Sequence, residues 1–191
     1  MVSLDLLSSF DGIIWLQSGK KAGSLFKQHQ TTISRNQKKC AQIFGIELRK
    51  TSSHWQLQED SLLLQLERIV HQLARLQGKT SLRLDANRWV DSPLLNPPPP
   101  GWLVSSARNI NDLHSLECLQ QRIVDACLYP ITDLPAQTQH LKKMELNVKE
   151  EIGVVVLQEH AEQERILDLI NMLNQASSTE QSKGMNLIPQ P

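Results

Sequence analysis

Cysteine is scarce in this chain of 191 residues, and its three copies, Cys40, Cys118 and Cys127, lie far apart. They form no C-x-x-C pair, and the six histidines form neither an H-x3-H nor an H-E-x-x-H pattern. These absences argue against a disulfide framework and against a zinc site. We therefore predict no metal, no cofactor and a reducing, cytoplasmic environment.

Long hydrophobic runs are also missing. No uncharged apolar segment approaches the roughly 18 to 20 residues that a membrane-spanning helix needs. The first apolar segment contains Asp5 and Asp11 and lacks a cationic start, which is not the pattern of a signal peptide. We expect no membrane partner.

The formal net charge is zero, but the charge is unevenly distributed. Residues 20–50 hold eight Lys and Arg side chains and one acid, Glu47, whereas residues 110–191 hold twelve acids and six bases. A sequence pI near 7.0 argues against a uniformly basic nucleic-acid binder. It leaves room for a local basic surface, because binding depends on where charge lies.

The first 58 residues have the element order of a helix-turn-helix. Apolar spacing predicts a helix over 3–17, with Ser3 as N-cap, a short helix over 21–27, and a second helix over 31–44 that ends at Gly45. The segments IELRK and HWQLQ then predict two paired strands. A generic small helical bundle with a hairpin is the alternative interpretation.

The stretch QTTISRNQKKC, residues 30–40, belongs to the second of these helices. Helical geometry places Ile33, Gln37, Cys40 and Phe44 on one face, and Arg35, Lys38, Lys39 and Gln42 on the other. A helix that enters the major groove of DNA needs this division, since Arg and Lys reach phosphates or guanine edges. The alternative is a basic face that contacts only water.

Residues 59–77 predict a long amphipathic helix. Its apolar seam has the 4, 3, 4, 3 spacing of a heptad repeat and consists of Leu62, Leu66, Ile69, Leu73 and Leu76. We predict that this seam forms a homodimer. Packing of the seam within a single chain stays open as an alternative.

From Thr80 onwards the pattern alternates between strands and helices. Strands are predicted at SLRL, WLVSS, ACLY and 153–157, and helices at 111–124 and around Ile166 to Leu173. This alternation predicts an open α/β layer. Residues 176–191, rich in Ser, Gln and Pro, are expected to be a disordered tail.

The first 75 residues or so resemble the LysR-type bacterial transcriptional regulators. The residues that carry the resemblance are Ala22, Phe26, Gln30, the triplet Ile33-Ser34-Arg35, and Gly45, Ile46 and Leu48. The resemblance implies an α+β protein with a winged helix-turn-helix (1–58), a dimerising linker helix (59–78) and an effector domain of the periplasmic-binding-protein type (79–175). The last of these is shortened here.

By this resemblance, Gln30, Thr31, Ser34 and Arg35 contact DNA bases or backbone, and Lys38 and Lys39 lie along phosphates. His29 stands where the family has a Ser cap. The shortened second domain yields no predicted effector-binding residue, so a small-molecule effector stays an open alternative.

The leading hypothesis is a homodimeric transcriptional regulator that binds specific sequences in double-stranded DNA. The alternative is a dimeric interaction protein with a degenerate sensor domain that pairs with a related regulator or another protein. We do not predict an enzyme, because His114 and Cys118 lack an orienting third group and no phosphate-binding glycine loop is present.

Overall fold

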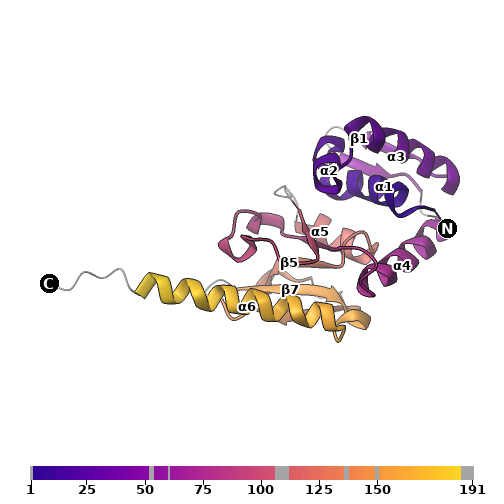
Figure 1. Cartoon of the computed structure of the whole chain (residues 1–191). Coiled ribbons are helices and arrows are strands. Elements are labelled where there is room, and N and C mark those ends of the chain that lie inside the picture. The colour runs from indigo at the N-terminus through magenta and orange to yellow at the C-terminus, as the bar shows by residue number, and fades with distance from the viewer. Residues whose placement is uncertain are drawn as a thin grey trace.

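A computed structural model describes residues 2–51, 54–59, 61–105, 112–135, 138–148 and 151–185. A helical N-terminal unit is joined by α4 to a layer built around a β-sheet (Figure 1). Along the described part of the chain, no helix combines the length and hydrophobicity needed to cross a membrane.

Three helices open the chain: α1 (Leu4–Leu16), α2 (Gly19–Phe26) and α3 (Gln30–Phe44). Ser3 caps α1 as predicted, and Ser18 caps α2, so α2 begins two residues earlier than its apolar pattern indicated. Gly45 ends α3 in the left-handed conformation, at φ 63°. Every residue of α1 from Leu6 is buried except Ser8, so α1 forms the centre of the N-terminal unit.

The connection between α2 and α3 is tight. The Gln28 amide donates to the Gly23 carbonyl at 2.8 Å. A Cβ at Gly23 would lie 2.6 Å from the Gln28 carbonyl oxygen, which is too close for any side chain. Glycine at this position therefore lets α3 follow α2 directly.

Strands β1 (Leu48–Thr51) and β2 (His54–Leu57) pair antiparallel, as the sequence predicted, with Leu48 opposite Leu57. The Gln17 side chain holds this pair against the end of α1. Its oxygen accepts from the Trp55 amide at 2.5 Å, and its nitrogen donates to the Trp55 carbonyl at 3.2 Å. Ser52 and Ser53, between the strands, lie outside the described residues.

Helix α4 spans Leu62–Leu76 and leads into a five-stranded sheet. The strands are β3 (Leu82–Asp85), β4 (Trp102–Val104), β5 (Ala126–Pro130), β6 (Leu141–Glu145) and β7 (Ile152–Leu157). Their spatial order is β4-β3-β5-β7-β6. Both β4 and β5 run parallel to β3, whereas β7 is antiparallel to its neighbours β5 and β6.

The sheet of the predicted α/β layer is mixed, with both parallel and antiparallel pairs. A parallel return from β5 to β7 would need a crossover, usually a helix. The described chain between them holds instead a short 3-10 turn and β6, which forms a hairpin with β7. The sequence analysis missed β6, an edge strand in which no residue is fully buried.

Two hydrophobic cores lie on opposite faces of the sheet, because alternate residues of β5 and β7 point to opposite sides. Helix α6 (Glu164–Met185) covers one face, and α5 (Asp112–Gln120) covers the other (Figure 1). The core beneath α5 also contains α1, since Cys127 and Val155 share it with Phe10 and Trp15. The segments 1–58 and 79–175 thus share a buried core, and their predicted boundaries stay predictions.

The C-terminal helices differ from the predicted ranges. Helix α5 ends at Gln120 rather than near residue 124, and Arg122 takes a positive φ of 59° before β5 begins. Helix α6 extends to Met185, into the range 176–191 for which a disordered tail is predicted. Ser177 is buried and donates to the Asn147 carbonyl at 3.0 Å, which holds this part of α6 on the protein. Residues 186–191 lie outside the described chain.

Candidate nucleic-acid interface

The inner face of α3 packs against α1. Ile33 and Cys40 are fully buried there, and the Asn36 amide donates to the Ser9 hydroxyl of α1 at 3.0 Å. Burial, followed by the nearby Asp11 carboxylate, raises the pKa of the Cys40 thiol to about 12. This face is therefore structural, as the helical spacing predicted.

The outer face of α3 is open to solvent. All six side chains that the resemblance assigns to DNA are exposed: Gln30, Thr31, Ser34, Arg35, Lys38 and Lys39. Within the described chain, the cations Arg35, Lys38 and Lys39 form no ion pair. Their charge is thus available to an external anion.

The basic flanks of α3 are less uniform than the sequence implied. Lys20, Lys21, Lys27 and Lys50 are exposed. Arg49, by contrast, donates to the Glu47 carboxylate at 2.8 Å, and this hydrogen bond lowers the pKa of Glu47. The one acid of residues 20–50 is therefore already paired with a cation.

The start of α3 lacks a side-chain cap. His29 occupies the N-cap position without a side-chain hydrogen bond to the first turn. The first backbone N–H groups of a helix have no intrahelical acceptor, and they carry the positive end of the helix dipole. The N-terminus of α3, which carries Gln30 and Thr31, therefore adds to the positive potential of the outer face.

The predicted dimer seam on α4 is mostly exposed. Leu62 is 69% exposed, Leu66 50% and Leu73 45%, while Ile69 is half-buried. Leu76 differs from the prediction, because it is buried in the core on the α6 face of the sheet. Helix α4 ends at Leu76, and this side chain is only 7% exposed, so it offers little surface to a second molecule.

Two neighbours extend the exposed part of this seam. Leu63 is 64% exposed and Val70 45% exposed. We call Leu62, Leu63, Leu66, Val70 and Leu73 the apolar stripe of α4. An exposed stripe of this kind on a helix is typical of a surface that another molecule covers.

The buried face of α4 is polar, which the sequence analysis did not predict. Arg68 and Arg75 are each 3% exposed, and they bind Asp11 of α1 and Asp125, which precedes β5. Gln72 also donates to Asp125, at 3.3 Å. These contacts fix α4 between the N-terminal unit and the sheet. Their partners lie about 50 residues away in sequence, so local spacing could not identify them.

Residues near the ends of β3 and β4 make contacts within the protein. Ser105 is buried, donates to Asp85 at 2.9 Å and accepts from the Ala86 amide at 2.8 Å. The Arg88 guanidinium lies 5.1 Å from the centre of the Trp89 ring.

The neighbouring side chains of His114 and Cys118 are poorly suited to nucleophilic catalysis. Cys118 Sγ lies 3.6 Å from His114 Nε2, which is also 3.2 Å from the Trp15 carbonyl oxygen. Burial raises the pKa of the Cys118 thiol well above its usual value, so a thiolate nucleophile is disfavoured. Across the described ranges, no three His, Cys, Asp or Glu side chains are grouped so that they could hold a metal ion.

Solved structures of LysR-type transcriptional regulators resemble this chain. Full-length OxyR from Pseudomonas aeruginosa is 16% identical over 76% of this chain and 53% of its own, with a TM-score of 0.44. LysG from Corynebacterium glutamicum, solved with the effector Arg bound, is 18% identical over 76% and 55%, with a TM-score of 0.33. CrgA from Neisseria meningitidis is 16% identical over 76% and 54%, with a TM-score of 0.29.

The chain spans about half the length of these solved structures. No protein-family model matches it, and no curated protein matches it. These solved structures belong to the LysR-type regulators, the family that the sequence resembles. Because their TM-scores lie below 0.5, the functional proposal rests on the residues of this chain.

Proposed function

We propose that this chain is a transcriptional regulator of the LysR type that binds specific sequences in double-stranded DNA as a homodimer. Helices α1 to α3 and strands β1 and β2 would form its winged helix-turn-helix. The observation that carries the proposal is the outer face of α3. There, three cations that form no ion pair among the described residues stand beside amide and hydroxyl side chains, opposite a buried apolar face.

Each side-chain type on this face suits one kind of DNA contact. Arg35 can donate two hydrogen bonds to a guanine edge, and Gln30 can pair with an adenine edge or a phosphate. Lys38 and Lys39, one turn further along α3, suit phosphates, where they set affinity more than sequence preference. A second copy of α3 in a dimer would contact a second half-site. We place this activity in the cytoplasm, as the sequence predicts.

The test is binding of the full chain to DNA from upstream of its own gene, measured by fluorescence anisotropy at several salt concentrations. Arg35→Ala should weaken specific binding by about 1 to 3 kcal/mol. Lys38→Ala should weaken binding to all sequences alike and reduce the slope of log K against log salt by about 1.

The matched control is Lys142→Ala, which removes an exposed lysine on the edge strand β6. Its affinity and salt slope should equal those of the wild type. Unchanged binding by both Arg35→Ala and Lys38→Ala would refute the assignment of this face to DNA.

A second candidate function is a dimeric interaction protein that pairs with a related regulator or another protein. The apolar stripe of α4 favours it, because the stripe could pair with a different chain as well as with itself. Sedimentation of the purified chain, alone and mixed with a related regulator, separates the two. A chain that is monomeric alone and dimeric only in the mixture supports the second function.

A further inference from the structure

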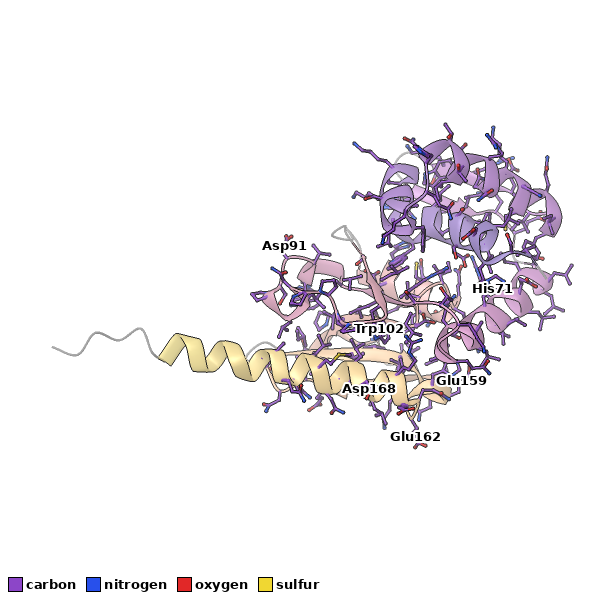
Figure 2. All side chains as sticks on the ribbon, in the orientation of Figure 1. His71, Asp91, Trp102, Glu159, Glu162 and Asp168 are labelled. Carbon is purple, nitrogen blue, oxygen red and sulfur yellow. The ribbon has the colours of Figure 1, made fainter. Side chains whose placement is uncertain are left out.

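A cavity of about 370 Å³ lies where the N-terminal helices, α4 and the start of the sheet meet. Its charged lining consists of Lys27, Arg75, Lys79 and Arg83, with one acid, Asp5. His71 lines it from α4, on the side of that helix that faces the N-terminal unit (Figure 2). The cavity is thus bordered by three parts of the protein, and its lining is mainly cationic.

Two of the lining cations, Arg75 and Arg83, are buried, and Arg75 is bound to Asp125. The Arg83 side chain is 3% exposed, and its guanidinium carbon Cζ lies 5.2 Å from the centre of the Phe26 ring. Nη1 donates to the Ile123 carbonyl at 2.9 Å, and Nη2 donates to the Ser8 hydroxyl at 2.8 Å. Both acceptors are neutral. Because a guanidinium carries five N–H donors, these two bonds leave donors for a ligand.

Two buried carboxylates that act on Arg83 are hydrogen-bonded to other arginines. Asp11 accepts two hydrogen bonds from Arg68, at 2.9 and 2.8 Å, and Asp125 accepts two from Arg75, at 2.8 and 2.9 Å. Each carboxylate is thus engaged by another arginine. The nearest carboxylate oxygen to the Arg83 guanidinium, Asp11 Oδ2, lies 3.6 Å away, beyond hydrogen-bond distance. The Arg83 guanidinium therefore lacks a hydrogen-bonded carboxylate, although three buried carboxylates, Asp11, Asp85 and Asp125, accompany the three buried arginines of this region.

A buried guanidinium whose closest carboxylate oxygen lies beyond hydrogen-bond distance is incompletely compensated. Burial, followed by repulsion from Arg75, lowers the pKa of Arg83 to about 10, so Arg83 remains a cation at neutral pH. A buried charge is stabilised when it is paired and hydrogen-bonded. Lys27 and Lys79, which are exposed and form no ion pair within the described chain, increase the positive potential at the cavity mouth.

We propose that this cavity is a binding site for a small anion, whose carboxylate or phosphate group pairs with Arg83. Lys27 and Lys79 hold its remaining negative charge. The volume lies in the range of about 300 to 1,000 Å³ that is usual for small-molecule pockets, so the ligand is of metabolite size. The site is independent of the DNA-binding face, and its test uses no DNA.

The test titrates the 15N-labelled full chain with inorganic phosphate and, separately, with succinate, while potassium chloride keeps the ionic strength constant. Backbone amide signals of Thr80 and Ser81, which line the cavity, report binding by NMR. A saturable shift with phosphate alone, with succinate alone or with both supports the site and identifies the anionic group. No saturable shift with either anion, or shifts confined to α3, overturns it.

Variants test the assignment to this cavity. The double variant Lys27→Gln/Lys79→Gln should bind the active anion at least about tenfold more weakly, which corresponds to about 1.4 kcal/mol. The control Lys20→Gln/Lys142→Gln removes two other exposed lysines and should bind as the wild type does. Arg83→Lys keeps the charge but loses the guanidinium fork, so it should bind more weakly than the control. Equal affinity in the Lys27→Gln/Lys79→Gln variant and its control would overturn the site.

Discussion

Arg68 and Asp11 form a buried ion pair that joins α4 to α1. Arg68 Nε and Nη2 both donate to Asp11 Oδ1, at 2.9 and 2.8 Å, and the side chains are 3% and 1% exposed. Arg68 Nη1 also donates to the Gln121 side chain, just beyond α5, at 3.2 Å. One side chain on α4 thus contacts both the N-terminal unit and the segment that leads into the sheet.

We expect Arg68→Met to destabilise the protein by about 3 to 5 kcal/mol. The Asp11 carboxylate would stay buried without a hydrogen-bonded cation, because Arg83 Nη1 lies 3.6 Å from Asp11 Oδ2. The double variant Asp11→Leu/Arg68→Met should lose less than the sum of the two single changes, since it leaves neither partner unpaired. Urea denaturation measures the free energy of unfolding of all three variants. Strictly additive losses would show that the pair is not coupled.

The control for this experiment is the exposed pair between Glu47 and Arg49, in which both side chains are 60% exposed. Solvent screens such a pair and weakens its contribution. Arg49→Gln should therefore leave the urea midpoint unchanged within error.

A second prediction concerns the uncapped start of α3. His29→Ser should stabilise the protein by about 0.5 to 1 kcal/mol, because a serine hydroxyl can accept from the free N–H groups of the first turn. Ser18→Ala should act in the opposite direction by about 1 kcal/mol, since Ser18 Oγ accepts from the Lys21 amide at 3.3 Å. Thermal and urea unfolding measure both. A His29→Ser variant no more stable than the wild type would show that the first turn is satisfied by water.

The helices were predictable from apolar spacing, but the buried face of α4 was not. The leucine spacing of α4 correctly predicted a helix, yet the face that packs within the chain is that of Arg68, Gln72 and Arg75. From sequence alone, an arginine is expected at the surface unless a buried counter-charge for it is known. Here the counter-charges come from Asp11 and Asp125, which only the tertiary fold brings to α4.

On α3, the spacing of apolar residues was sufficient to predict which face is buried. Its inner residues Ile33 and Cys40 and its outer residues Arg35, Lys38 and Lys39 lie on the faces that the sequence predicted, because only one side of α3 meets α1. Strand β6 was missed for the opposite reason. Its LKKME sequence carries two lysines and gains its strand conformation from pairing with the buried β7.

A third prediction concerns pH. Burial lowers the pKa of His71 and of His160 below the usual value of 6.5, although the neighbouring Glu67 and Glu159 oppose this shift. The folded protein therefore binds fewer protons at these sites than the unfolded chain does. Stability from this source is fully present above about pH 6.5 and is lost as the pH falls below it.

Chemical denaturation between pH 7.5 and pH 5, in steps of about half a unit around the histidine range, measures this loss. His71→Gln and His160→Gln should each reduce the fall in unfolding free energy at acidic pH. The control His140→Gln removes an exposed histidine and should retain the wild-type pH dependence. A wild-type protein that is more stable at pH 5.5 than at pH 7.5 would contradict the assignment.

The last prediction concerns the apolar stripe of α4 and rests on the proposed homodimer. Leu66 and Leu73 are half exposed, and two turns of helix separate them on the same side of α4. In a dimer, these side chains would be removed from water, and a carboxylate at either position would have to be buried or would block the contact. We therefore expect Leu66→Glu/Leu73→Glu to sediment as a folded monomer at concentrations where the wild type is a dimer.

The matched control is Leu113→Glu/Leu167→Glu, which places two carboxylates at exposed leucines on α5 and α6. It should remain dimeric, with the same dissociation constant as the wild type in sedimentation at graded concentrations. Because Leu66 and Leu73 contribute little to the core of the single chain, far-UV circular dichroism of the α4 variant should match the wild type. A wild-type protein that stays monomeric at high concentration and on DNA would leave the stripe without a homodimeric role, and the pairing experiment with a related regulator would then decide its partner.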